Sequence, residues 1–414
     1  MSKHNYNRVV ITGAGVVSSL GSDWQEVKST IQSKRSGVRF MEDWQKFEGL
    51  GTYLAAPVTD FEMPPHYTKK KKRSMGRVAQ MGVLATERAL EQARLLGDPV
   101  VNSAATGIAY GSATGSSQAA LEFVPMLESF STSRINSSTY LRMMSHTAAV
   151  NISVYFGTQG RMYTTSSACT AGSQAIGFSY EAIRSGQQEV MIAGGAEELC
   201  PSQAAVFDTL FAASKKNSTP EATPRPFDAD RDGLVLGEGA CTLVLESLER
   251  AQKRGANILA EVVGYATNTD GAHLVKPNLD TVKRVMSDAL SDANLSASQI
   301  GYVSAHGTAT SHGDISESQA TFEVMGAKPT SSLKSYTGHT LGACGSFEAW
   351  ASIMMMNENW FAPTLNLDKV DPRCAALDFI QGESRHINTD YIMSNNLAFG
   401  GVNTSLIFKR YTEN

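Results

Sequence analysis

Residues 163–195 read YTTSSACTAGSQAIGFSYEAIRSGQQEVMIAGG. The β-branched and aromatic residues before Cys169 predict a strand, and residues 170–185 predict a helix that stops at Gly186. The apolar run at 190–193 predicts a further strand. A cysteine at such a junction stands at a helix N-terminus, where the helix dipole favours the thiolate. Cys169 is therefore a candidate nucleophile, although an arbitrary cytosolic cysteine is more often a small buried hydrophobe.

Strand and helix patterns alternate along the rest of the chain. We expect strands at 8–15, 106–112, 259–265, 300–304 and just before Lys334, and helices at 22–33, 76–95, 281–290 and up to about Met356. The first strand is expected to end in a glycine turn, and Ser22 with Gln25 is expected to form a capping box. The alternation predicts an α/β protein with parallel or mixed sheets covered by helices.

Composition narrows the class of protein. A chain of 414 residues is longer than one core usually supports, so we expect two halves, 1–256 and 257–414, divided in a polar stretch. The net charge of -4 argues against nucleic-acid binding. No signal-peptide pattern or membrane-length apolar run occurs in the sequence, so we expect a cytoplasmic protein with no membrane contact.

Neither a metal nor a nucleotide cofactor is indicated. The five cysteines form no CxxC pair, which fits reduced thiols and no metal site. The glycines near the N-terminus suggest a dinucleotide fingerprint, but Ser18 stands where its third glycine belongs.

Two histidine segments follow predicted strands. One is AHGTATSHGD at 305–314, which contains His306, and the other is KSYTGHTLG at 334–342, which contains His339. Strand ends are where α/β proteins place their chemistry. A single histidine beside a glycine is more often structural, but two such loops together with Cys169 indicate a catalytic site.

These segments belong to a longer series of motifs that covers nearly the whole chain. The series is VVITGAG (9–15), SSACTAG (166–172), AGGAEE (193–198), PRPFDADRDGLVLGEGA (224–240), AHGTATSHGD, KSYTGHTLGACG (334–345) and AFGGVN (398–403). In this order the motifs resemble the elongating β-ketoacyl-acyl-carrier-protein synthases, the Cys-His-His condensing enzymes of the thiolase superfamily. The resemblance implies a five-layered αβαβα fold built from two similar halves, and a homodimer.

The resemblance also implies roles for the central residues. Cys169 would accept an acyl group from acyl carrier protein, because a thiolate is both a good nucleophile and a good leaving group. Neutral His306 and His339 would stabilise the enolate formed when malonyl thioester loses CO₂. The backbone N–H groups of Cys169 and Phe399 would form the oxyanion hole, and Phe399 would gate acyl entry. No metal or organic cofactor is implied, since the substrates are carried on the phosphopantetheine of the carrier.

Five further residues are assigned supporting roles by the same resemblance. Lys334 would pair with Glu348 and fix the loop that carries His339. Asp314 would brace the loop that carries His306. Thr308 and Thr310 would bind the pantetheine arm.

Departures from the family pattern fall around the substrate. Thr114 corresponds to the far end of the acyl tunnel and Phe207 to its wall, and a hydroxyl at 114 is unusual for a saturated chain. This leaves open an unsaturated, aromatic or polyketide-like acyl group. Ala398 replaces a glycine before the gate and is expected to stiffen it. Cys344 is interpreted as a packing residue, although a thiolase would need a second catalytic cysteine.

Partners follow from charge and from the resemblance. The only dense basic run is 69–73, and we expect acidic acyl carrier protein to dock through Lys70 and Arg73. The predicted reaction is a decarboxylative Claisen condensation in fatty-acid or in polyketide or polyene biosynthesis. One alternative is the catalytic subunit of a heterodimer with a chain-length-factor-like protein, and a weaker one is a thiolase-type acyltransferase.

Overall fold

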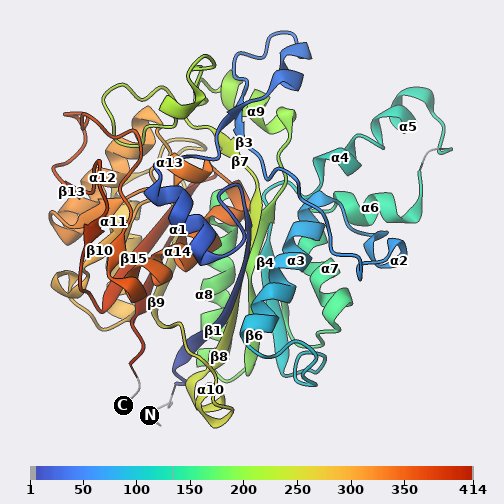
Figure 1. The fold of residues 1–414 in the computed structure, drawn as a ribbon, viewed down its shortest axis with the longest axis horizontal. Helices are drawn as coiled ribbons and strands as arrows, with labels where there is room; N and C mark the ends of the chain where they lie inside the picture. Colours follow the sequence, from blue (N-terminus) through green and yellow to red (C-terminus); the bar gives the residue numbers. More distant parts are fainter. Residues whose placement is uncertain (1–5, 134, 413–414) are drawn as a thin grey trace.

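One mixed sheet of eleven strands runs through both halves of the protein, with helices on its faces (Figure 1). The structure, a computed structural model, describes residues 6–133 and 135–412. The strand order is β13-β11-β10-β15-β16-β9-β1-β8-β6-β4-β5. Within the described ranges, no helix is both long and apolar enough to cross a membrane.

The two halves of the chain form the two ends of this sheet in its strand order. The first half supplies β1 (Val9–Ser18), β4 (Thr106–Gly111), β5 (Met162–Thr164), β6 (Val190–Glu197) and β8 (Gly239–Ser247). The second half supplies β9 (Ala260–Thr269), β10 (Tyr302–Ser304), β11 (Pro329–Ser331), β13 (Asp378–Phe379), β15 (Tyr391–Ala398) and β16 (Val402–Lys409). The antiparallel pairing of β1 with β9 joins them. We propose that the halves divide between residues 256 and 257, in the segment before β9.

The longer helices form three layers around the sheet. On the first half, α3 (Arg77–Gln92) and α7 (Thr147–Phe156) cover the outer face, and on the second half α11 (Leu279–Asp292) and α12 (Ser311–Met325) do so. Between the halves lie α8 (Ala171–Arg184) and α14 (Cys344–Glu358), which contact each other. This is the expected five-layered αβαβα arrangement.

Shorter elements fill the connections. The remaining helices are α1 (Trp24–Gln32), α2 (Lys69–Lys72), α4 (Ser117–Ala120), α5 (Val124–Ser129), α6 (Ser137–Met143), α9 (Pro201–Thr209), α10 (Leu248–Lys253) and α13 (Lys334–Thr337). Single 3₁₀ turns include η2 (Ala168–Thr170) and η5 (Leu341–Ala343). Outside the main sheet lie the short strands β2 (Arg39–Phe40), β3 (Leu54–Ala56), β7 (Leu236–Gly237), β12 (Trp360–Phe361) and β14 (Arg385–His386).

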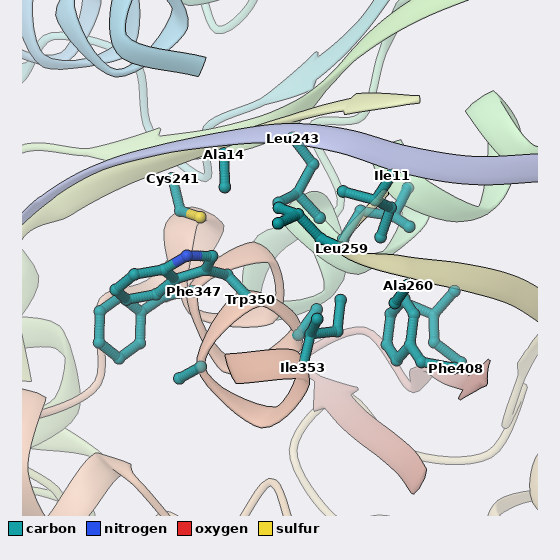
Figure 2. Packing of buried hydrophobic residues seen from close by; sticks show 14 of the residues in the cluster. Ile11, Ala14, Cys241, Leu243, Leu259, Ala260, Phe347, Trp350, Ile353 and Phe408 are labelled. Atoms are coloured by element: carbon teal, nitrogen blue, oxygen red, sulfur yellow. The ribbon is translucent and has the colours of Figure 1, made fainter. Parts of the chain in front are cut away.

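The largest buried cluster lies between the sheet and α14. Figure 2 shows Ile11 and Leu243 on the sheet facing Trp350 and Ile353 on the helix. All four side chains are buried. Because each such side chain contributes roughly 1.5–3 kcal/mol when fully buried, this cluster fixes α14, and with it the loop before it, against the sheet.

The expected glycine turn near the N-terminus is wrong. Gly13 and Gly15 lie inside β1, which continues to Ser18. A Cβ at Gly13 would stand 2.3 Å from the carbonyl oxygen of Ala89, and one at Gly15 would stand 2.0 Å from that of Ala85. The two glycines therefore allow α3 to pack directly on the strand.

Two element boundaries also differ from expectation. Asp23, not Ser22, caps α1, because its carboxylate accepts the N–H of Glu26 at 2.9 Å, while Glu26 accepts the N–H of Ser22. The strand expected just before Lys334 ends at Ser331, and Lys334 begins the short helix α13.

Candidate active site

Cys169 lies at the junction between β5 and α8. The chain turns through η2, where Ala168 adopts a left-handed φ of 51°, and delivers the cysteine to the start of α8. The thiol is buried and its Sγ lies 2.9 Å from Nε2 of His339. Backbone N–H groups of Phe399 and of Cys169 itself also face the sulfur.

Burial has the largest effect on the protonation of this thiol. Desolvation raises the pKa of Cys169 to about 12, and the charge of Lys334 and the two backbone N–H groups only partly oppose it. The expectation of a resting thiolate is therefore wrong. The free protein holds a neutral thiol next to a histidine that can take its proton.

His306 follows β10 and is held by a buried carboxylate. Glu317 accepts the backbone N–H of His306 at 2.6 Å and that of Gly307 at 2.8 Å. Nδ1 of the His306 ring lies 3.1 Å from Nζ of Lys334. Because an ammonium can only donate, Nδ1 accepts, and the neutral ring carries its proton on Nε2.

His339 is held by its backbone beside β7. Its N–H donates to the carbonyl of Val235 at 2.7 Å, and its own carbonyl accepts the N–H of Gly237 at 2.9 Å. Its ring lies edge-on to that of His306, with the centroids 5.3 Å apart. Burial, helped by the charge of Lys334, lowers the pKa of both histidines well below the usual value, so both are neutral at physiological pH.

Lys334 is the buried charge behind this pair. Its Nζ contacts a carboxylate oxygen of Glu348 as well as Nδ1 of His306. Asn396 donates to the other oxygen of Glu348 at 2.7 Å, which satisfies the carboxylate. The sequence argument linked Lys334 to the loop of His339, but the structure adds a direct contact to His306.

A cavity of about 460 Å³ leads from the surface to Cys169 and both histidines. Thr308 and Thr310 line it, and their hydroxyl oxygens lie 3.0 Å apart. Phe207 and Phe399 also line it, with ring centroids 5.2 Å apart. Polar groups thus line one wall of the cavity, and an aromatic pair lies beside the nucleophile.

Phe399 stands on the tight turn between β15 and β16. The N–H of Gly401 donates to the carbonyl of Ala398 at 3.0 Å, and both Gly400 and Gly401 adopt left-handed φ angles. Leu274 accepts the N–H of Gly400 from a neighbouring loop. The turn thus fixes the backbone that presents the Phe399 ring to the cavity.

Thr114 is placed differently from Phe207. Its hydroxyl donates to Glu197 at 2.8 Å and accepts from Gln203 at 2.9 Å. Glu197 is fully buried and also accepts the N–H of Gly342, just beyond His339. Thr114 is absent from the cavity lining, so its hydroxyl serves this hydrogen-bond network in the free protein.

Asp314 and Cys344 lie just behind the reacting groups. The carboxylate of Asp314 accepts the backbone N–H groups of Thr308 and Phe227 at 3.1 and 2.7 Å. The thiol of Cys344 lies 3.2 Å from the carbonyl oxygen of Cys169. Cys344 thus approaches the main chain of the nucleophile and is absent from the cavity lining.

Lys70 and Arg73 lie away from this cavity. Both side chains are exposed, at or next to α2, which Figure 1 shows on the side of the molecule near α3 and α7. Neither lines the cavity.

Two groups of buried side chains have the spacing of metal ligands. In the first, Cys169, His306 and His339, Lys334 keeps a proton on Nε2 of His306, so that nitrogen is a donor and not a ligand. In the second, His306, Cys344 and Glu348, the Lys334 ammonium already contacts His306 and Glu348. Both groups therefore suit hydrogen bonding better than metal binding.

Glu317 and Asn396 were not identified from the sequence. Glu317 lies one turn after Asp314 on α12, so the i, i+3 spacing of two buried carboxylates was a usable signal. Asn396 lies in β15, where the sequence around it carries no motif that indicates a partner for Glu348.

Two family models together match most of the chain. The family model "Beta-ketoacyl synthase, N-terminal domain" matches residues 6–251, and "Beta-ketoacyl synthase, C-terminal domain" matches 259–368. The chain is 34% identical over 408 residues to a 3-oxoacyl-[acyl-carrier-protein] synthase 1 of Haemophilus influenzae, covering 98% of this chain and 99% of that protein.

Solved structures show the same fold. A crystal structure of a beta-ketoacyl synthase from Burkholderia phymatum is 55% identical with a TM-score of 0.97, and covers 98% of this chain and 100% of that one. The ishigamide ketosynthase/chain length factor is 32% identical with a TM-score of 0.88, again over 98% and 100%.

Proposed function

The chain belongs to the β-ketoacyl synthase family, and we propose that it transfers an acyl group from acyl carrier protein to Cys169 and condenses it with malonyl carrier protein. One observation carries the proposal. A neutral thiol and two neutral histidines meet at the end of one cavity, and a buried lysine fixes the proton of one histidine on the nitrogen that can donate to substrate.

In the first half-reaction Cys169 attacks the acyl thioester. His339 Nε2, 2.9 Å from the sulfur, accepts the thiol proton. The N–H groups of Cys169 and Phe399 stabilise the oxyanion that forms. As the tetrahedral intermediate collapses, the C–S bond to the carrier breaks, and the departing carrier thiolate takes the proton back from His339.

In the second half-reaction the malonyl thioester loses CO₂. Its C–C bond breaks, and the electron pair becomes an enolate whose oxygen accepts N–H bonds from Nε2 of His306 and of His339. The enolate carbon then attacks the acyl-Cys169 carbonyl. The Cys169 thiolate leaves and is reprotonated through the neighbouring Nε2 of His339 by a proton taken up from solvent, because the decarboxylation itself releases none, and the β-ketoacyl group remains on the carrier. These steps use protein groups and two carrier-bound thioesters.

The different surroundings of the two histidines support this division of labour. Nδ1 of His339 has no hydrogen-bond partner among the described residues, so neither tautomer of that ring is fixed. His339 can therefore accept a proton in the first step and donate one in the second. His306 is fixed as a donor and suits the second step alone.

Carrier proteins and a second subunit are the proposed partners. The Haemophilus influenzae relative is named for acyl carrier protein, and we propose the same carrier here, with docking at Lys70 and Arg73. We propose a homodimer. Likeness to the ishigamide ketosynthase/chain length factor keeps a heterodimer as the alternative assembly, with this chain as the catalytic subunit because Cys169 is present.

Intact mass spectrometry tests the mechanism. Native protein incubated with hexanoyl carrier protein should gain one hexanoyl group, and malonyl carrier protein should then remove it as a β-ketoacyl product. Cys169→Ala should gain no adduct. His306→Ala should accept the acyl group at close to the native rate but lose condensation by roughly 10²–10³-fold. An adduct on Cys169→Ala, or no adduct on the native protein, refutes the proposal.

A further inference from the structure

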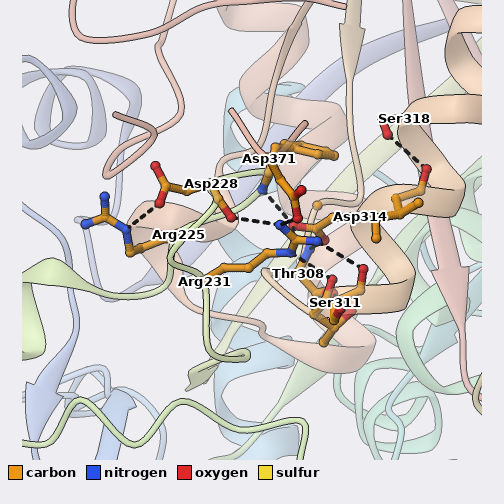
Figure 3. Close-up of polar contacts among 12 residues, drawn as sticks. Arg225, Asp228, Arg231, Thr308, Ser311, Asp314, Ser318 and Asp371 are labelled. Carbon is orange, nitrogen blue, oxygen red and sulfur yellow. Dashed lines mark hydrogen bonds and ion pairs between the residues drawn. The ribbon is translucent and has the colours of Figure 1, made fainter. Parts of the chain in front are cut away.

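A buried ion-pair network lies behind the polar wall of the cavity. Figure 3 shows Arg231 at its centre, between Asp371, Asp314 and the loop before α12. The Arg231 side chain is only 2% exposed, yet it lines the cavity. A charge in that position is desolvated and must be matched by specific partners.

The guanidinium of Arg231 is matched on two sides. On one side, Nη1 donates to the carboxylate of Asp371 at 2.6 Å and to the backbone carbonyl of Asp228 at 2.7 Å. The other side donates to the carbonyls of Thr310 and Ser311 at 3.3 and 3.1 Å. Its planar fork of donors joins the 225–232 segment to the start of α12, which a lysine could not do as fully.

Arg231 and Asp314 hold the same loop from both ends. Asp314 accepts the N–H of Thr308, and its other oxygen lies 3.7 Å from Arg231. Arg231 donates hydrogen bonds to the backbone carbonyls of Thr310 and Ser311. Together they fix the backbone that presents the Thr308 and Thr310 hydroxyls to the cavity.

We propose that Arg231 is a positioning residue for substrate: by clamping the 308–311 loop it sets the affinity of the cavity for the pantetheine arm, and not the reactivity of Cys169. The inference rests on the proposed function, because it assumes that a pantetheine thioester enters this cavity. Arg231 contacts neither Cys169 nor His339, so its removal should leave the nucleophile unchanged.

The test compares three reagents on Arg231→Gln. Hexanoyl-pantetheine carries the full arm, hexanoyl-N-acetylcysteamine carries a truncated arm, and iodoacetamide reports on the thiol alone. Acylation or alkylation of Cys169 is followed by intact mass over a range of concentrations. We expect the half-saturating concentration of hexanoyl-pantetheine to rise about 10-fold, the equivalent of roughly one hydrogen bond, with little change in the maximal rate. The other two reagents should react as with native protein.

Arg225→Gln is the matched control. Arg225 pairs with Asp228 and Asp368 in the same network but makes no hydrogen bond to residues 308–311. The Arg225→Gln variant should keep the native half-saturating concentration of hexanoyl-pantetheine. Arg231→Lys, which keeps the charge without the planar fork, should give an intermediate value and decides the question if Arg231→Gln does not fold.

A pH profile separates positioning from a general loss of structure. Burial raises the pKa of Asp314 to about 6, and Arg231 opposes the rise. Removing the guanidinium should raise that pKa further, so affinity for hexanoyl-pantetheine should begin to fall at a higher pH than in native protein. Besides Arg231, the titratable groups that act on Asp314 are Glu317 on its own helix and Cys374 from the C-terminal segment, and Asp371 contacts the same guanidinium. All three remain in the variant. Arg231 also lowers the pKa of Asp371 and Cys374, so the shift between the two profiles reports the loss of the Arg231 charge from this whole cluster.

Two results would overturn the inference. One is an equal loss of Cys169 modification with all three reagents in Arg231→Gln, which would make Arg231 purely structural. The other is the same half-saturating concentration in Arg231→Gln as in Arg225→Gln. Failure of the proposed function looks different, because native protein itself would then take no acyl group from either thioester.

Discussion

Lys334 gives the two catalytic histidines different properties. It donates to Nδ1 of His306 and so fixes the proton of that ring on Nε2. Nδ1 of His339 has no such partner among the described residues. Burial lowers the pKa of both rings well below the usual value, and the charge of Lys334 adds to this, so both rings are neutral. One buried ammonium therefore sets the tautomer of His306 and reinforces the effect of burial on the charge of both rings.

Replacing Lys334 by Met should separate stability from catalysis. The change leaves Glu348 buried without its cation, and we expect the free energy of unfolding to fall by about 3–5 kcal/mol. Malonyl decarboxylation should fall by roughly 10²–10³-fold, because Nδ1 of His306 loses its donor. Adding Glu348→Gln should restore much of the stability but none of the CO₂ release. Denaturant titration and a CO₂ assay measure the two effects, and native decarboxylation in the double variant would contradict the argument.

The buried thiol predicts a characteristic pH dependence. Because the pKa of Cys169 is raised to about 12, the group is neutral at pH 7, and its thiolate fraction grows tenfold with each pH unit below that value. The rate of alkylation by iodoacetamide should therefore rise steadily from pH 7 to 10. A plateau already reached at pH 7 would instead show a thiolate stabilised by the start of α8. Alkylation is measured by mass on native protein, with Cys169→Ala as the blank.

At the residue scale the sequence indicated the reacting groups better than their supports. Cys169, His306 and His339 occur in motifs with adjacent glycines, so their positions could be predicted. Asn396 could not, because its contact with Glu348 exists only in the fold. Glu317 was missed although its i, i+3 spacing from Asp314 was a usable signal. The protonation of Cys169 was predicted wrongly, since a local helix dipole says nothing about how deeply the thiol is buried.

At the element scale, two glycines bring the nucleophile and its histidine together. A Cβ at Gly172 on α8 would stand 2.8 Å from the backbone N of Ser346, and one at Gly345 on α14 would stand 2.7 Å from that of Ser173. The starts of these two helices therefore touch backbone to backbone. Cys169 precedes one of them and His339 precedes the other, so this contact sets the distance between sulfur and imidazole.

Gly172→Ala should disturb catalysis through this contact. The added methyl has to push α8 and α14 apart, which should cost about 1–3 kcal/mol in the free energy of unfolding. A displacement near 1 Å at the nucleophile can lower the rate about 10²-fold, and acyl transfer should fall by that order. Glu181→Ala, on the exposed side of α8, is the matched control and should keep native acylation. An active and fully stable Gly172→Ala would contradict the close-packing argument.

The elements near Cys169 could be predicted well from local sequence, and those that depend on distant partners could not. The helix expected at 170–185 is α8, and the strand expected at 190–193 is the first part of β6, which continues to Glu197. The turn expected near Gly13 failed because the reason for that glycine is α3, about seventy residues later in the chain. A glycine required by tertiary packing looks like a turn glycine when only its neighbours are read.

At the scale of the whole molecule, the basic run at α2 and the catalytic cavity are formed by different segments of the chain. The chain carries a formal net charge of -4, but α2 is made of four lysines and is followed by Arg73. The residues of the cavity come from other segments, including α9, the 270–277 loop and the start of α12. A carrier docked at α2 must therefore reach Cys169 with its flexible arm.

Reversing both proposed docking charges tests this arrangement. Lys70→Glu with Arg73→Glu should raise KM for hexanoyl carrier protein about 10-fold at low salt, because the carrier is acidic and its approach is guided by charge. The effect should shrink as ionic strength rises and the Debye length falls to about 8 Å. Hexanoyl-pantetheine, which has no protein to dock, should react normally. Reversing the exposed Lys46 and Lys253 gives the same change in net charge at other surfaces and should leave KM unchanged. An equal rise in both double variants would mean that net charge, and not a surface at α2, guides the carrier.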